Sequence, residues 1–178
     1  MEIKNRYIIG IDPDIDKSGY AVLDVLEKKF VRVEALSFSK LIITLSSLVW
    51  NGLTSECLVI IEDSDNSTNW HLGDMKMSAR AAAAIGHNVG LCHATQRHIK
   101  EWAENIRLRV ELQKPLKKTW LGSKGKISQE EAECFMPGLP KKTNTEMRDA
   151  ALLAWCRANL PIHIPASFYT ELMKKKKK

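Results

Sequence analysis

The stretch IIGIDPDIDKSGYAVLD, residues 8–24, decides how this chain begins to fold. An apolar run over residues 7–11 leads to Asp12, and a turn containing proline and aspartate separates it from a second apolar run over 19–24. This pattern predicts two strands joined by a tight turn, with a carboxylate at the end of the first strand. A third apolar run over 30–36 follows closely, so we expect an antiparallel meander of three strands.

The rest of the chain alternates between patterns typical of helices and of strands. The predicted elements are a helix capped by Ser39 and ending at Trp50, a buried strand over 57–61, an alanine-rich helix over 74–94, a helix over 99–106, a strand over 108–112, a helix from the Ser128/Glu131 capping box to Pro137-Gly138, and a helix over 145–159. A meander followed by alternating helices and strands indicates an α/β layer structure with a mixed central sheet. We expect one domain over residues 1–163 and a lysine-rich tail over 164–178.

Composition is that of an ordinary soluble domain. The chain has 178 residues, of which 44% are hydrophobic and 27% charged. It contains no apolar run long enough to span a bilayer and no signal peptide pattern, so we expect no membrane partner. Its four cysteines form no CxxC pair, which favours buried thiols in a reducing compartment.

Positive charge is concentrated in the second half of the chain. The net charge is +6, but five terminal lysines supply most of it. More informative are three basic segments between the second and third acidic segments: KPLKK at 114–118, GSKGK at 122–126, and KK at 141–142. Basic loops near a group of carboxylates suit a protein that holds a phosphodiester backbone.

Carboxylates recur at the ends of elements. Asp12 ends the first strand, Glu62 ends the buried strand CLVIIE, and Glu146 and Asp149 lie three residues apart in the first turns of the last helix. Oxygen ligands from three separate elements are what Mg²⁺ requires. Together, the four acids predict a site that gathers divalent metal ions.

Each acid also has a structural explanation. Asp12 precedes proline and would serve to start a turn, and Glu62 would form a salt bridge at a strand end, with Asp63 and Asp65 competing as the relevant acid. Acids favour the amino end of a helix, and Thr143 stands at capping-box spacing from Glu146. For each acid taken alone, the structural explanation is strong. The occurrence of all four acids together is what favours a metal site.

The order of these motifs resembles the RuvC family of Holliday junction resolvases, within the RNase H-like superfamily. The matching segments are GIDPDIDKSGYAV, VIIE ending at Glu62, the basic stretch LKKTWLGSKGKISQEEAECF, and EMRDAAL starting at Glu146. The resemblance covers roughly residues 7–158. Two departures stand out: Asp14 occupies a position where the family usually has glycine, and Glu146 one where aspartate is common. The segment over 95–110 is also longer than usual.

The resemblance implies an RNase H-like fold and a role for each matched residue. Asp12, Glu62, Glu146 and Asp149 match the family's acidic metal ligands, Lys117 or Lys118 and Lys126 match its phosphate-contacting lysines, and Trp70 is the equivalent of the aromatic residue near the junction centre. The implied cofactor is a pair of Mg²⁺ ions per active site, for which Mn²⁺ can substitute. We assign Asp12 as the ligand shared by both ions, because its strand is the most central.

The implied activity is Mg²⁺-dependent, structure-selective DNA cleavage that nicks four-way junctions symmetrically. Two symmetric nicks need two active sites, and hence a homodimer. The alanine-rich helix would form the interface or pack against its own sheet. We expect a cytoplasmic, nucleoid-associated protein of a bacterial or phage-infected cell.

Three other functions stay open at this point. The first is a nuclease with a broader range of branched DNA, as in a mobile element or phage. The second is an actin-like or hexokinase-like phosphotransferase, which shares the three-strand meander but needs a glycine-rich phosphate loop. The third is a junction-binding protein without catalytic activity.

Overall fold

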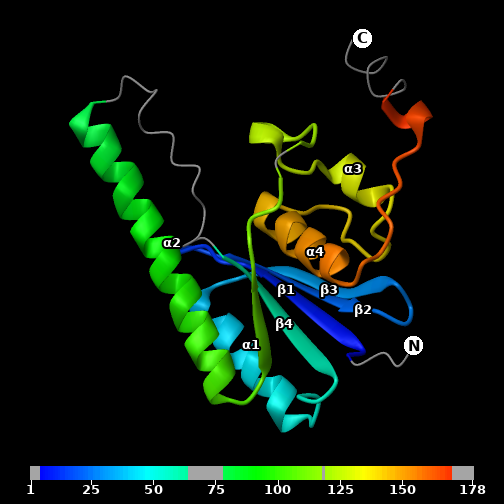
Figure 1. The fold of residues 1–178 in the computed structure, drawn as a ribbon, viewed down its shortest axis with the longest axis horizontal. Helices are drawn as coiled ribbons and strands as arrows, with labels where there is room; N and C mark the ends of the chain where they lie inside the picture. The colour runs from blue at the N-terminus through cyan, green and yellow to red at the C-terminus, as the bar shows by residue number, and fades with distance from the viewer. Residues whose placement is uncertain (1–4, 64–77, 118, 170–178) are drawn as a thin grey trace.

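A five-stranded mixed sheet forms the centre of the molecule (Figure 1). The structure is a computed structural model and describes residues 5–63, 78–117 and 119–169. The strands are β1 (Tyr7–Asp12), β2 (Ser18–Asp24), β3 (Lys29–Leu36), β4 (Cys57–Glu62) and β5 (Arg109–Gln113), in the order β3-β2-β1-β4-β5. β1 pairs antiparallel with β2 and parallel with β4, and β5 runs parallel to β4. The predicted meander and mixed sheet are confirmed.

Helices cover both faces of this sheet (Figure 1). They are α1 (Phe38–Trp50), α2 (Ala79–Asn105), α3 (Gln129–Glu133) and α4 (Thr145–Arg157), with a short 3₁₀ turn η1 (Ser123–Gly125). One hydrophobic core lies between the sheet and α3 and α4, and the other between the sheet and α1 and the second half of α2. Among the described residues, no helix is long and apolar enough to cross a membrane.

Side-chain alternation along β1 decides what faces α4. Ile9 and Ile11 belong to the core under α1 and α2, whereas Ile8 belongs to the core under α4. Because successive side chains of a strand point to opposite faces, Gly10 and Asp12 share the face of Ile8. Asp12 therefore lies on the side of the sheet that α4 covers.

Two glycines let α4 lie directly on the sheet backbone. A Cβ atom added to Gly10 would stand 2.0 Å from the carbonyl oxygen of Ala150. A Cβ atom on Gly19 would stand 1.9 Å from the carbonyl oxygen of Glu146. Any larger residue would push the helix away, so these glycines hold the first turns of α4 against the ends of β1 and β2.

The structure corrects the predicted helix boundaries. The two helices expected over 74–94 and 99–106 are one continuous helix, α2, because CHATQRH contains neither proline nor glycine to end it. Thr95 is accommodated inside this helix by donating its hydroxyl hydrogen bond to the Leu91 carbonyl. α1 is capped at Ser37, two residues before the expected Ser39, and α3 ends at Glu133, before Pro137-Gly138.

Only the second half of α2 packs on the sheet. Thr95, Ile99 and Ala103 are buried, whereas most residues from Ala79 to Ala94 are exposed, and this first half projects beyond the sheet (Figure 1). The described residues 78–90 are mostly exposed, so packing of that part of the segment against its own sheet is wrong. Its role as a dimer interface stays a prediction.

Candidate active site at the ends of β1 and β4

Asp12 and Glu62 end two adjacent parallel strands. Ile11 is in register with Ile61, and each acid is the next residue of its strand. The two acids therefore end their strands side by side at the same edge of the sheet. Leu58 and Ile60 belong to the core under α4, and alternation places the Glu62 side chain on that same face. The sequence prediction that both carboxylates emerge at one sheet edge is borne out by this register.

The first two turns of α4 add the other two acids. Asp12 pairs with Gly19 across β1 and β2, and Gly19 contacts the backbone at Glu146. Asp149 lies one turn further along the helix and is half-buried. The close contact at Gly19 thus links the end of β1 directly to the helix turn that carries these acids.

Asp12 is buried within the electrostatic reach of the other three predicted acids. Its side chain is buried, and burial raises the pKa of its carboxyl well above the usual value. The negative charges of Glu62, Asp149 and Glu146 raise that pKa further, while the positive charge of Lys126 lowers it. The charges of the other three predicted acids thus all act on Asp12, and their joint role in a metal site stays a prediction.

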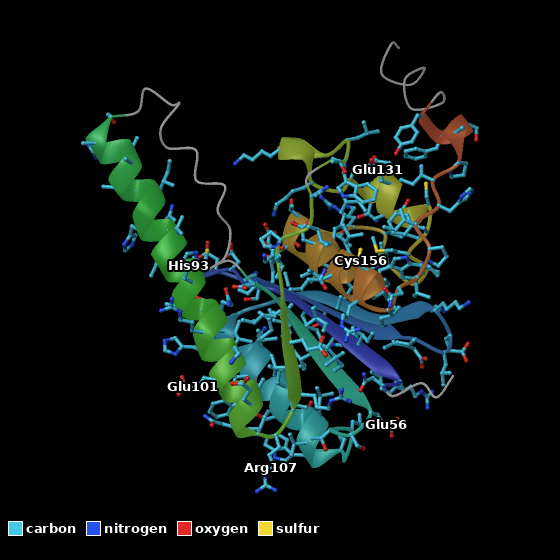
Figure 2. The ribbon with its side chains drawn as sticks, viewed as in Figure 1. Glu56, His93, Glu101, Arg107, Glu131 and Cys156 are labelled. Atoms are coloured by element: carbon cyan, nitrogen blue, oxygen red, sulfur yellow. The ribbon has the colours of Figure 1, made fainter. Side chains whose placement is uncertain are left out.

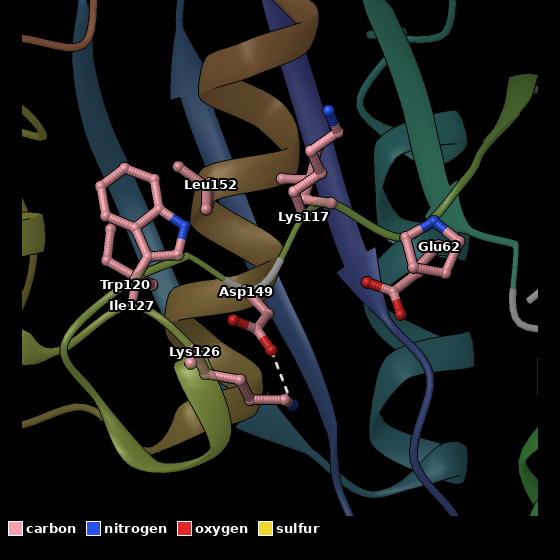
Figure 3. Close-up of a pocket in the computed structure, with 10 residues that line it drawn as sticks. Glu62, Lys117, Trp120, Lys126, Ile127, Asp149 and Leu152 are labelled. Atoms are coloured by element: carbon pink, nitrogen blue, oxygen red, sulfur yellow. Dashed lines mark ion pairs between the residues drawn. The ribbon is translucent and has the colours of Figure 1, made fainter. Parts of the chain in front are cut away.

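Lys126 lies inside this group of acids. Its Nζ atom is 2.7 Å from Oδ2 of Asp149, with side chains that are 28% and 15% exposed, respectively (Figure 3). Burial lowers the pKa of Lys126, but its hydrogen bond to Asp149 and the charges of Asp12 and Glu146 outweigh burial and leave that pKa raised. The sequence predicted a phosphate contact at this position, and the ion pair inside the acidic site was not foreseen.

A small hollow of about 80 Å³ opens beside the ion pair (Figure 3). Glu62 lies on one side of it, and Asp149 and Lys126 lie on the other. Lys117, the second predicted phosphate contact, also lines it, together with apolar side chains that include Trp120 and Leu152. Trp120 was missed as a site residue, although its place between two basic segments was the available signal. Its ring stacks on Phe135 at 6.0 Å between centroids.

A buried carboxylate organises the loop that delivers Lys126. Glu131, only 1% exposed, accepts hydrogen bonds from the backbone N–H of Leu121 and of Ser128, each at 3.0 Å (Figure 2). The bond to Ser128 belongs to the predicted capping box, which is confirmed. The bond to Leu121 closes the loop at its base, and it was not predicted. At Gly122 an added Cβ atom would stand 2.3 Å from the Lys126 carbonyl oxygen.

Arg148 fastens the same segment to α4. Its Nε donates to the Ile127 carbonyl at 2.8 Å, and its Nη1 donates to the Thr143 carbonyl at 2.7 Å. Arg148 stands between Glu146 and Asp149 on the helix, so one side chain ties the loop end to the turn that carries both acids. The sequence did not predict this contact, since nothing local marks an arginine that binds a carbonyl 21 residues away.

Two of the structural roles that could explain the acids are filled by other residues. Asp14 organises the β1–β2 turn, because its Oδ1 accepts from the N–H of Asp16 at 2.8 Å and of Lys17 at 3.3 Å. Asp12 is not needed for that task. Asn144, and not Thr143, caps α4 by accepting from Met147 N–H at 2.9 Å, so the expected capping box with Glu146 is wrong.

Several predicted residues lie outside the described part of the chain. They are Trp70, Lys118 and the competing acid Asp65. Asp63 is described and buried, but the acid at the strand end that acts on Asp12 is Glu62.

The donor set fits Mg²⁺ in its chemistry, since it consists of hard carboxylate oxygens held from three elements. Across residues 5–63, 78–117 and 119–169, no three acidic, histidine or cysteine side chains stand close enough together to hold a metal ion as they are. Within this group, the ammonium of Lys126 contacts the carboxylate of Asp149.

Comparison with known proteins identifies the fold. Neither a protein-family model nor a curated protein matches the chain. Thermus thermophilus RuvC in complex with Holliday junction substrate superposes with a TM-score of 0.51 and 14% identity, over 94% of this chain and 96% of that chain. A second Thermus thermophilus RuvC structure gives a TM-score of 0.51 and 15% identity, over 86% and 96%. The yeast mitochondrial Holliday junction resolvase Ydc2 has a TM-score of 0.41 and 12% identity, over 87% and 80%.

The similarity to RuvC extends over nearly the whole length of both chains. It includes the mixed sheet and the helices that flank it, so the predicted fold class is confirmed. The chain has the RNase H-like fold of the RuvC Holliday junction resolvases.

Proposed function

We propose that this protein is a metal-dependent endonuclease that cuts branched DNA, with the four-way junction as its substrate. The observation that carries the proposal is the set of charges acting on Asp12: three further carboxylates and one lysine, contributed by β4, α4 and the loop before α3. One structure with the same fold is RuvC in complex with a Holliday junction substrate, which supports the choice of substrate.

Asp12, Glu62, Glu146 and Asp149 are the residues that would hold Mg²⁺. When bound, two such ions supply charge stabilisation at both the attacking and the leaving oxygen and lower the pKa of water. Asp12 is central to the set because the other three acids all act on it. Its burial also excludes water from one side of the site, which strengthens every electrostatic interaction there.

Lys117 and Lys126 line the hollow beside these acids and would hold the phosphate backbone. Lysine contacts to phosphate position a DNA strand but do not read its sequence. Trp120 and Leu152 supply an apolar wall in the same hollow, on which a sugar or a base edge next to the scissile phosphate can rest. Symmetric cleavage of a junction would require two copies of this site, and we propose a homodimer for that reason.

The turn after β1 argues against a nucleotide phosphotransferase. That function needs backbone N–H groups at a glycine-rich loop that remain available for phosphate. Here Asp14 accepts the backbone N–H groups of Asp16 and Lys17, so the turn is already occupied by a negative side chain.

One experiment tests the nuclease proposal. A labelled synthetic four-way junction and a linear duplex of matched sequence are incubated with the protein in Mg²⁺ or in EDTA, alongside Asp12→Asn. We expect paired nicks in the junction only with Mg²⁺ and wild-type protein, with Asp12→Asn still binding the junction. Three-way and flap substrates in the same assay measure the branched-DNA range. Cleavage by Asp12→Asn at the wild-type rate, or no cleavage of any branched substrate, would overturn the proposal.

A further inference from the structure

We propose that Lys126 is a built-in counter-ion of the metal-free site, and that it competes directly with divalent cations for Asp149. The inference rests on the proposed function, because it takes Asp149 as a metal ligand. It goes further by assigning the lysine a task in the protein without DNA, in addition to a phosphate contact.

The first observation is the contact itself. Lys126 Nζ lies 2.7 Å from Asp149 Oδ2, which is the length of a strong charge-assisted hydrogen bond. Asp149 is one of the residues that would hold Mg²⁺, and a bound cation would need the same carboxylate oxygen. An ammonium and a metal ion therefore cannot share this face of the carboxylate, and one must leave when the other arrives.

The second observation is that Lys126 also interacts with carboxylates other than that of Asp149. Asp12 and Glu146 also act on its ammonium, so it offsets the repulsion among carboxylates that belong to β1 and α4. Without this ammonium, the buried Asp12 would lose the positive charge that opposes the effect of the three neighbouring acids on it. The lysine thus stabilises the arrangement of acids before any metal binds.

The third observation is that the backbone around Lys126 is held in place while its side chain is flexible. Its backbone is fixed on both sides, by Glu131 at Leu121 and Ser128 and by Arg148 at Ile127. Its side chain is a flexible four-carbon stem that is 28% exposed and lines the hollow shared with Lys117. The ammonium can therefore leave Asp149 by rotation of its own side chain, without unfolding the loop, and move toward a DNA phosphate in that hollow.

This geometry predicts coupling between the two ligands. If a phosphate draws Lys126 away from Asp149, the carboxylate becomes available to a cation. By thermodynamic linkage, a cation at Asp149 then makes Lys126 available to phosphate by the same factor. Lys126 would in this way suppress metal binding in the absence of DNA and favour it when DNA is present.

The test compares Mn²⁺ affinity, measured by calorimetry without DNA, between wild type, Lys126→Gln and the control Lys124→Gln. Lys124 is an exposed lysine of the same loop, so its variant measures the general effect of losing one positive charge. We expect Lys126→Gln to bind Mn²⁺ about ten-fold more tightly than wild type, the scale of one lost charged hydrogen bond, and Lys124→Gln to change affinity less than two-fold. Equal or weaker binding by Lys126→Gln would overturn the proposal.

A second measurement uses wild-type protein and so does not depend on how the variant folds. Lysine acylation is followed by peptide mass spectrometry with and without saturating Mn²⁺. We expect the modification rate of Lys126 to rise several-fold with Mn²⁺ while that of Lys124 stays constant, and an unchanged rate at Lys126 would refute the exchange. Failure of the proposed nuclease function is recognised separately, by the absence of Mg²⁺-dependent junction cleavage in wild type.

Discussion

The Gly19 Cα lies so close to Glu146 that a methyl group on it would meet the helix backbone, 1.9 Å from the Glu146 carbonyl oxygen. Gly19 is in turn the register partner of Asp12. Because Gly19 has no side chain, Glu146 and Asp149 of α4 can lie near Asp12 of β1.

Gly19→Ala should therefore damage both the fold and the site. We expect a loss of about 1–3 kcal/mol in the free energy of unfolding, the usual cost of overpacking, together with loss of junction cleavage. Gly86→Ala is the matched control, because nothing lies within 4 Å of the Cβ added there. In the interior of α2 that control should raise stability by about 1 kcal/mol. Urea unfolding of both variants checks the pair, and equal stabilities would contradict the close packing.

Asp12→Asn should stabilise the metal-free protein at neutral pH while abolishing cleavage. Burial and neighbouring carboxylates raise the pKa of Asp12 in the folded state. The folded state therefore favours the protonated form, and its stability falls as the pH rises from the ordinary carboxyl range through the raised folded pKa. In EDTA, wild type should lose stability over this window, and Asp12→Asn should lose less. Thermal unfolding at a series of pH values measures the difference, and parallel curves would count against it.

Divalent cations should stabilise the wild-type protein because they bind the folded acids and not the unfolded chain. At a cation concentration of about 100 times Kd, the expected gain is about 2.7 kcal/mol. Asp149→Asn should reduce this gain, since it removes one of the carboxylates that act on Asp12. Differential scanning calorimetry with Mg²⁺ or EDTA provides the measurement. A gain in Asp149→Asn as large as in wild type would remove Asp149 from the ligand set.

Glu131→Ala should loosen the loop that carries Lys126. The substitution leaves the N–H groups of Leu121 and Ser128 without their carboxylate partner, which costs about 1–3 kcal/mol for a buried group. Glu130→Ala on the same short helix is the control, because Glu130 is exposed. We expect cleavage to fall only for Glu131→Ala, with a junction assay and urea unfolding as readouts. Full activity in both variants would show that the loop holds its shape without this carboxylate.

Lys117 and Lys126 should contribute to the salt dependence of DNA binding. Each phosphate contact adds about 0.9 to the slope of log affinity against log salt concentration. The double variant Lys117→Gln/Lys126→Gln should therefore bind junction DNA with a slope about 1.8 smaller than wild type. Lys28→Gln, in the β2–β3 turn at the opposite edge of the sheet, should keep the wild-type slope. Fluorescence anisotropy across a salt series decides between these outcomes.

The acids were predictable from sequence because strand alternation and helical spacing are local rules. Four apolar residues before Glu62 suffice to place it at the end of a buried strand, and a three-residue interval places Glu146 and Asp149 together. Strand alternation and helical spacing do not predict which of several lysines contacts the acids. The pairing of Lys126 with Asp149 depends on the loop closure by Glu131 and Arg148, which only the folded chain reveals.

Helix boundaries failed for a similar reason. Thr95 is a poor signal for the interior of a helix, yet it is buried there, because packing on the sheet overrides local propensity. Ser39 resembled a cap, but the chain already turns into α1 after Ser37.

In the first half of α2, local helix propensity contributes more than packing on the sheet. From Ala79 to Ala94 it extends for about 24 Å, mostly exposed, so little tertiary contact holds it in shape. Alanine, the residue that needs the least outside help to stay helical, is abundant in this segment. Its helical form therefore depends more on its own composition than on packing, and we expect its amide hydrogens to exchange with solvent faster than those of the half that lies on the sheet.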